Sequence, residues 1–278
     1  MAQLLAPDGA ALAYDVYEPQ RRPPRAAVLW VCGWSDHRTR WQPAAERLCR
    51  TGYAVYLLDQ RGQGDSGGRR GHLSRFSQLL GDLQALRRLA RLRHAAPQVL
   101  LGHSFGALVV LRYLETQPSD PVAAAVLSSP WLKTKQPVPA LKRALARALA
   151  DLWPTLRIAT GTLASELCRD PAVGVAYDAD PAVHQVMTPS AWREIQWAQR
   201  VVPLDGHRIE SPLLFLLGGG DRVTDAQAVQ AFADAQRVPA QVRWYAGMYH
   251  ELLNDPEGER VTGDVAEFLA AQVNTPKA

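Results

Sequence analysis

The chain has 278 residues, of which 47% are hydrophobic and 21% charged, and its formal net charge is +4 at pH 7. A chain of this length buries a large core and fits one sizeable domain, or one domain with an insertion, better than two independent domains. The basic residues are scattered among acidic ones, so the charge does not predict nucleic-acid binding.

The sequence carries no pattern of a leader peptide or a membrane helix. Its first residues lack a basic stretch followed by an apolar one, and no later run reaches the roughly 18 uncharged apolar residues that a membrane helix needs. Cys32, Cys49 and Cys168 cannot all pair and lack C-x-x-C spacing, which indicates a reducing compartment and no cysteine metal site. We therefore expect a soluble, cytoplasmic protein.

The first 130 residues alternate between strand and helix patterns. Apolar or alternating runs predict strands at 12–16, 26–32, 54–58, 99–101 and 122–127. Apolar residues at helical spacing predict helices at 43–50, 76–92 and 107–114. Gly52 is the expected C-terminal cap of the first helix, and Ser74 the expected N-cap of the second. Buried strands that alternate with helices indicate an α/β fold with a mainly parallel sheet covered on both faces.

The alternation stops between residues 131 and 206. This segment predicts a helix at 138–152, helical pieces around Leu163, Ala182 and Trp192, and no clear strand. Strand and helix patterns then resume at 213–217, 225–236, 242–245 and 262–271. We therefore predict a core made of residues 1–130 and 207–278, with an inserted helical cap at 131–206.

A G-x-S-x-G motif, 102–106 (GHSFG), lies between the strand predicted at 99–101 and the helix predicted at 107–114. In a nucleophile elbow the serine occupies a strained strand-to-helix turn, where a side chain at either glycine would collide with neighbouring backbone. The turn presents the hydroxyl at the carboxyl end of the sheet, beside helix N–H groups that favour negative charge. Ser104 is therefore predicted to be a nucleophile, the alternative being an ordinary tight turn.

A nucleophilic serine needs a base within hydrogen-bond reach and a third group that orients the base. Asp221 follows the strand predicted at 213–217, and His250 follows the one at 242–245, so both lie at the same sheet edge as Ser104. We predict that His250 is the base and Asp221 the acid, unless Asp221 only binds loop amides. The other histidines precede the acid, adjoin the serine or lie in predicted helix or cap: His37, His72, His94, His103, His184 and His207.

Acyl transfer also needs N–H donors for the oxyanion that forms on the substrate. One predicted donor is the N–H of Phe105, directly after the serine, and the second is the N–H of Trp34, in the loop after an early central strand. Gly33 gives that loop room to approach, and the Trp34 side chain remains free to pack. The reaction needs neither a cofactor nor a metal.

Several motifs carry a resemblance to a known group of proteins. They are Gly33-Trp34, 59–66 (DQRGQGDS), the elbow, 218–225 (GGGDRVTD), Tyr249-His250 and, in the cap, 165–171 (SELCRDP) and 177–181 (YDADP). Along nearly its whole length the chain resembles the monoacylglycerol lipase and lysophospholipase group of α/β-hydrolases, and the cap motifs are more specific than the elbow. The resemblance implies an α/β-hydrolase fold and hydrolysis of lipid-like esters by a triad of Ser104, Asp221 and His250.

One position departs from that group. The group usually has His-Gly before the oxyanion donor, whereas this chain has Cys32-Gly33, and a thiol cannot replace the hydrogen bonds of an imidazole. We expect a less firmly held oxyanion loop and a higher kcat on Cys32→His, unless Cys32 lies in a pocket that a larger ring would overpack. A catalytic Cys32 is the weaker alternative, because no histidine is assigned to it.

The helix predicted in the cap carries one apolar face, formed by Leu141, Ala144, Leu145, Ala148, Leu149 and Leu152. This stripe either roofs the substrate, with Leu145 and Leu149 as binding residues, or packs the cap onto the core. The basic residues between Lys133 and Arg147 either form a solvated helix face or let the cap touch anionic head groups of a membrane surface transiently.

We therefore expect a serine hydrolase that cleaves carboxylic esters of monoacylglycerol or lysophospholipid type through an acyl-enzyme on Ser104. Two alternatives stay open. The same fold would serve a small-ester carboxylesterase or an amide or peptide hydrolase, because a fold does not fix its substrate. A ligand-binding protein that lost catalysis through the altered Cys32 loop would keep the fold as well. The sequence does not predict the oligomeric state.

Overall fold

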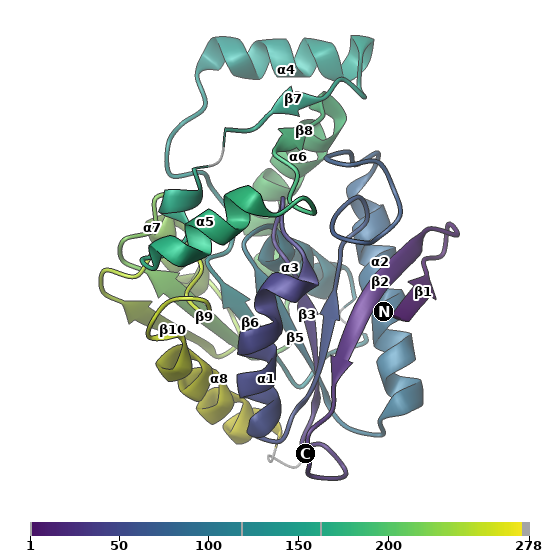
Figure 1. Cartoon of the computed structure of the whole chain (residues 1–278), viewed down its shortest axis with the longest axis vertical. Helices are drawn as coiled ribbons and strands as arrows, with labels where there is room; N and C mark the ends of the chain where they lie inside the picture. The colour runs from purple at the N-terminus through teal and green to yellow at the C-terminus, as the bar shows by residue number, and fades with distance from the viewer. Residues whose placement is uncertain (1, 118, 162, 274–278) are drawn as a thin grey trace.

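A computed structural model describes residues 2–117, 119–161 and 163–273. Its centre is an eight-stranded sheet with the order β1-β2-β4-β3-β5-β6-β9-β10 (Figure 1). The strands are β1 (Ala2–Leu5), β2 (Ala11–Tyr17), β3 (Ala27–Val31), β4 (Ala54–Leu58), β5 (Gln98–His103), β6 (Ala124–Ser128), β9 (Leu213–Gly218) and β10 (Ala240–Tyr245). β2 is antiparallel to β1 and β4, and all other pairs are parallel. The predicted mainly parallel sheet is confirmed.

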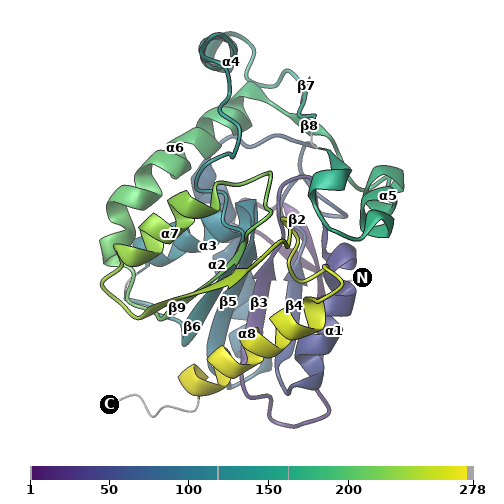
Figure 2. The same ribbon diagram turned by 90° about the vertical axis from the view of Figure 1, so that its left-hand side faces the viewer.

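Helices cover both faces of this sheet (Figure 2). They are α1 (Gln42–Arg50), α2 (Phe76–Arg93), α3 (Phe105–Thr116), α7 (Ala226–Asp234) and α8 (Gly258–Val273). Side chains alternate across a strand, so β3 sends Leu29 and Val31 into the core under α2, α3 and α7, and Trp30 into the core under α1 and α8. Two buried faces explain why these strands are continuous apolar runs.

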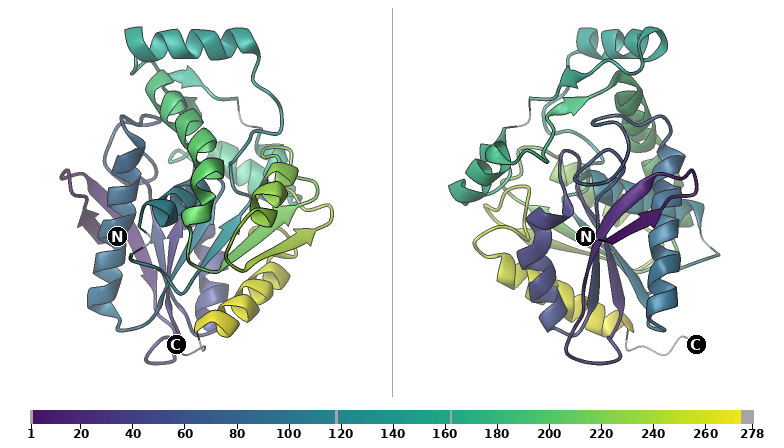
Figure 3. Two further views of the ribbon diagram at one scale, coloured as in Figure 1. Left: turned by 180° about the vertical axis from the view of Figure 1, so that it is seen from behind. Right: turned by 45° about the vertical axis from the view of Figure 1, so that its right-hand side comes forward.

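The chain between β6 and β9 lies over the carboxyl ends of the parallel strands (Figures 1 and 3). Its elements are α4 (Ala140–Leu152), β7 (Ile158–Ala159), a 3₁₀ turn (Ala164–Glu166), α5 (Pro171–Ala179), β8 (Val186–Met187) and α6 (Pro189–Asp205). Two expectations were wrong. β7 and β8 form an antiparallel pair where no strand was predicted, and Ala182 lies in a turn rather than a helix. Two-residue strands are too short to show a periodicity.

The two ends of this segment differ in how they meet the core. Ala191, Ile195, Ala198 and Val202 of α6 are fully buried in the same cluster as α2 and α3, so α6 packs onto the helices that cover this face of the sheet. In α4, by contrast, Ala150 is the buried residue. The cap boundaries at 131 and 206 remain a prediction.

Smaller differences concern the ends of elements. Arg75, not Ser74, occupies the N-cap position because α2 begins at Phe76, and the Ser74 hydroxyl lies 3.1 Å from His72 Nε2. β1 was not predicted, since this edge strand is four residues long and mostly exposed. Within the described residues, no helix is long and apolar enough to cross a membrane.

Candidate active site

Ser104 stands at the sharp turn where β5 ends and α3 begins. Its φ of 52° and ψ of −114° lie in a region that residues with a side chain rarely adopt. A Cβ on Gly102 would lie 2.5 Å from the Cα of Ala107, and one on Gly106 would lie 2.1 Å from the Val31 carbonyl oxygen. Both positions therefore require glycine, as the elbow motif predicts.

Asp221 and His250 come from the loops after β9 and β10 and meet at the same edge. His250 Nδ1 donates to Asp221 Oδ2 at 2.9 Å, and both side chains are buried. The Thr224 hydroxyl donates to the same oxygen at 2.7 Å, while the N–H groups of Val223 and Thr224 donate to Oδ1. The hydroxyl of Ser129 donates to the His250 carbonyl at 2.8 Å. The carboxylate and the imidazole are thus held from several sides.

Electrostatics fix the protonation of this pair. Burial alone raises the pKa of Asp221, but the charge and hydrogen bond of His250, with the donors of Thr224, lower the pKa of Asp221 to about 2. Burial lowers the pKa of His250, yet the adjacent carboxylate of Asp221 outweighs it and raises the pKa above the usual 6.5. An ionised Asp221 therefore keeps the proton on Nδ1 and leaves Nε2 free to accept one.

Ser104 and His250 line one cavity of about 680 Å³ at the carboxyl edge of the sheet. Much of its wall is apolar, and it includes Trp131, Leu145, Leu149, Met187 and Trp192. Its polar lining includes Asp36, Arg40, Tyr177 and Glu251. The volume suits a ligand of lipid or drug size.

The apolar stripe of α4 does not pack onto the core. Leu141 and Leu152 are 80% and 82% exposed, and Leu145 is 57% exposed. Leu145 and Leu149 line the cavity that Ser104 also lines, so the helix faces the cavity on one side and solvent on the other. These exposures favour the roof over the alternative in which the stripe attaches the cap to the core, and the choice between them stays a prediction.

Trp34 and Phe105 meet beside Ser104. Trp34 stands in the turn after β3, and its ring packs edge-on against Phe105 at 5.2 Å and against His184 at 5.7 Å. Phe105 is the first residue of α3, where the N–H has no acceptor within the helix. Trp34 lines the same cavity as Ser104.

The rival acid and bases have other partners. Asp225 caps α7 by accepting the N–H of Ala228 at 3.2 Å, and it also pairs with Lys133. His103 lies between the rings of Trp41 and His250, and burial lowers its pKa to about 3, so it stays neutral. The ring of His37 lies 2.8 Å from Asp180.

A buried ionic network beside the cavity was not predicted. Arg40, 9% exposed in its side chain, donates to Asp36 at 2.7 Å and to both oxygens of Glu251 at 2.8 and 2.9 Å. Its guanidinium lies over the ring of Tyr177. In the sequence these charged residues look like surface residues. Their positions could have indicated a place at the site, because Asp36 follows Gly33-Trp34 closely and Glu251 adjoins His250.

No metal site was predicted, and in the described ranges no group of three or more His, Cys, Asp or Glu side chains is placed to hold an ion. Cys32, Cys49 and Cys168 are free thiols. Burial raises the pKa of the Cys32 thiol well above its usual value, which disfavours the thiolate that a nucleophilic cysteine needs.

The chain is similar to known hydrolases in both sequence and structure. A family model described as serine aminopeptidase, S33, matches residues 22–257. The chain is 32% identical over 270 residues to a monoacylglycerol lipase of Mycolicibacterium smegmatis, covering 95% of each, and 27% identical over 241 residues to phospholipase YtpA of Bacillus subtilis, covering 86% and 92%. The crystal structure of a Paleococcus ferrophilus monoacylglycerol lipase superposes with a TM-score of 0.85 at 29% identity, covering 94% and 99%. The chain therefore belongs to the serine aminopeptidase S33 family and, within it, to the monoacylglycerol lipase group of α/β-hydrolases, a group of ester hydrolases.

Proposed function

We propose that the protein is a serine hydrolase that cleaves carboxylic esters of monoacyl lipids. Nε2 of His250 takes the proton of the Ser104 hydroxyl, and the oxygen attacks the ester carbonyl. The N–H groups of Trp34 and Phe105 hold the oxyanion, and Asp221 stabilises the imidazolium. His250 then gives its proton to the leaving alcohol, and a water activated in the same way releases the acyl group.

One observation gives this proposal its main support. Ser104 and a histidine oriented by Asp221 line the same largely apolar cavity, which leads to α4. An apolar cavity of about 680 Å³ favours a long acyl chain over a short one, because each buried methylene contributes about 0.8 kcal/mol. The similar proteins named as monoacylglycerol lipase and phospholipase support a monoacylglycerol or a lysophospholipid as substrate.

We also propose that α4 touches the lipid surface from which such a substrate is drawn. Leu141, Leu152 and Trp153 are exposed apolar side chains, and Lys142 and Arg143 beside them are exposed basic ones. This combination suits transient contact with anionic head groups. The free thiols support a cytoplasmic location as part of the same proposal.

The second candidate is amide or peptide hydrolysis, which the description of the matching family as a serine aminopeptidase favours. The same triad would cleave an amide if His250 protonated the leaving amine. The apolar α4 wall argues for an ester of a lipid instead.

A substrate panel tests the proposal. The wild type and Ser104→Ala are assayed on monoacylglycerols and lysophospholipids of increasing chain length, on a butyrate ester and on aminoacyl anilides. We expect kcat/KM to rise with acyl-chain length, anilides to be poor substrates, and Ser104→Ala to be inactive with an unchanged Tm. Preference for anilides would favour the peptidase, and turnover by Ser104→Ala would contradict the proposal.

A further inference from the structure

The loop that carries the second oxyanion donor is held by side chains on both sides. The N–H of Gly33 donates to Asp36 Oδ2 at 3.0 Å. On the other side, Gln60 Nε2 donates to the Cys32 carbonyl at 2.7 Å, and Gln63 Nε2 donates to the Gly33 carbonyl at 3.1 Å. Side-chain hydrogen bonds therefore hold the N–H of Gly33 and the carbonyl oxygens of Cys32 and Gly33, directly before Trp34.

Asp36 makes more hydrogen bonds than Gln60 or Gln63. Besides Gly33, its carboxylate accepts hydrogen bonds from the indole N–H of Trp41 at 2.6 Å, the backbone N–H of His37 at 2.8 Å and Arg40 at 2.7 Å. Its own N–H donates to Gln63 Oε1 at 3.1 Å. Burial on its own raises the pKa of Asp36, but the guanidinium of Arg40 and these donors lower it below its usual range. The side chain is thus an ionised carboxylate in one fixed position.

Arg40 extends the contact to the base. It pairs with Asp36 and with both oxygens of Glu251, the residue after His250. The chain of Asp36, Arg40 and Glu251 therefore connects the loop of the oxyanion donor to the loop of the catalytic base.

Cys32 cannot supply this support. Its side chain is fully buried in the apolar cluster that contains Trp30 and Trp41, and a neutral thiol is a weak hydrogen-bond donor. We propose that Asp36 is the positioning residue that sets the N–H of Trp34 for the oxyanion, in place of an imidazole before Gly33. This inference rests on the proposed function, and it assigns Asp36 a role through the backbone rather than a contact with the reacting atoms.

The test is Asp36→Asn, which keeps the shape of the side chain. An asparagine has one acceptor oxygen, and its NH2 group would face N–H donors that now bond to the carboxylate. Removing an oxyanion donor outright costs about 10²–10³ in kcat, so displacing one should lower kcat by about 10- to 100-fold. We expect KM to change by less than about twofold, because ground-state binding does not use the oxyanion. The affinity for a long-chain alkyl trifluoromethyl ketone, which forms an oxyanion on Ser104, should fall by the same factor as kcat. The affinity for an alkyl ether of the same length should not change.

Asp120→Asn is the matched control, since Asp120 pairs with the buried Arg87 of α2 and neither residue lines the cavity. It should lower Tm without changing kcat or the affinity for the ketone. Should Asp36→Asn fail to fold, Gln63→Met removes the bonds to Gly33 and Asp36 without leaving a buried charge. It should lower kcat and the affinity for the ketone together by about three- to tenfold, because loosening an oxyanion donor costs less than removing it.

Amide hydrogen exchange at Gly33 separates this inference from the proposed function. Exchange there should accelerate at least tenfold in Asp36→Asn, while amides within β3 keep their rates, whether or not the ester panel finds activity. Unchanged exchange at Gly33, or a parallel loss of affinity for the ether and the ketone, would overturn the positioning role. Accelerated exchange in a protein whose wild type hydrolyses no ester would overturn the proposed function alone.

Discussion

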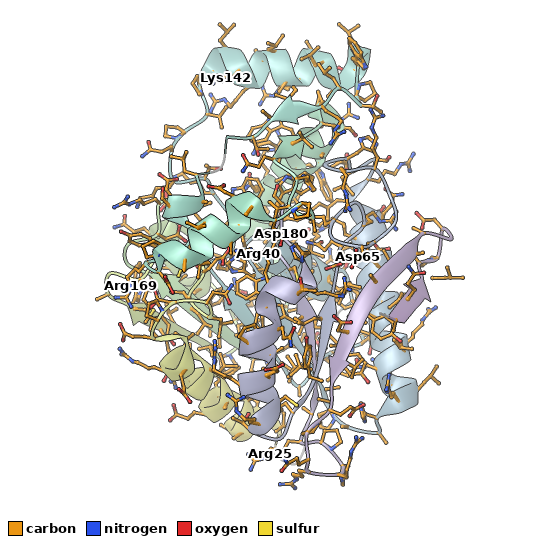
Figure 4. All side chains as sticks on the ribbon, in the orientation of Figure 1. Arg25, Arg40, Asp65, Lys142, Arg169 and Asp180 are labelled. Carbon is orange, nitrogen blue, oxygen red and sulfur yellow. The ribbon has the colours of Figure 1, made fainter. Side chains whose placement is uncertain are left out.

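The two halves of the segment between β6 and β9 meet the rest of the molecule in different ways. In the half around α5, Arg169 pairs with the buried Asp255, the Leu167 carbonyl accepts the N–H of Glu251 at 2.7 Å, and Asp180 lies 2.8 Å from His37. At α4, by contrast, the ion pair between Asp151 and Arg193 of α6 is exposed on both sides. Figure 4 shows Arg169 beside α5 and Lys142 out on α4.

Because of this difference, we expect the two halves to affect catalysis in different ways. The α5 half is attached to the loops of the proposed base and the proposed oxyanion donor, so we expect it to set the rate for every substrate. The helix α4 contributes Leu145 and Leu149 to the cavity, packs against α6 and exposes Leu141 and Leu152 to solvent, so we expect it to select acyl-chain length.

The largest effect is expected at the reaction centre that both halves share. Asp221→Asn should lower kcat by about 10⁴-fold for short and long esters alike, because His250 would lose the partner that fixes its tautomer. Steady-state kinetics on a butyrate and a long-chain ester measure this. Asp225→Asn, which removes the cap of α7 instead, should leave kcat within about twofold; a larger effect there would mean that Asp225 is the acid.

The α4 half is tested by replacing Leu145 and Leu149 with serine together. The loss in kcat/KM should be small for acetate and butyrate esters and should grow with chain length, by roughly fourfold for each methylene that loses its contact. A chain-length series together with Tm measures this. Equal losses for short and long chains would show that α4 does not select the acyl chain.

The α5 half is tested by Arg169→Met, which leaves the buried Asp255 unpaired. We expect a lower Tm and a loss of about threefold to tenfold in kcat for all chain lengths, since small displacements of positioning groups cost rate. Arg193→Met is the control in the α4 half, because it removes an exposed ion pair of little energetic consequence. A loss in Arg169→Met that depends on chain length would remove the distinction between the two halves.

The smallest effect is expected from Cys32→His. The sequence favoured a higher kcat, but the loop is already held by Asp36, Gln60 and Gln63, and the thiol is fully buried. We therefore expect no gain in kcat and a loss of about 1–3 kcal/mol in the free energy of unfolding, because the larger ring overpacks the site. Thermal unfolding and kcat for one ester measure this; a gain in kcat at unchanged Tm would show that the loop lacks an imidazole.

Local patterns in the sequence predicted the main elements of the sheet and the candidate site. The strand before Ser104, the glycines around it and the positions of Asp221 and His250 after strands are local features with a physical cause. The Asp36–Arg40–Glu251 network was not predicted, because burial and pairing between residues 211 positions apart leave no local pattern. The periodicity of α4 did not predict which of its residues are exposed. An apolar stripe predicts a buried face, but it does not predict whether that face contacts the core or a substrate.

In the proposed mechanism, the pair of His250 and Asp221 activates Ser104. Reaction of the wild type with a fluorophosphonate, followed by mass spectrometry of the labelled peptide, tests it most directly. We predict rapid labelling at Ser104 alone, slowed by orders of magnitude in His250→Ala and in Asp221→Asn. Slow labelling of the wild type, or labelling at Cys32 or another residue with Ser104 unmodified, would contradict the account.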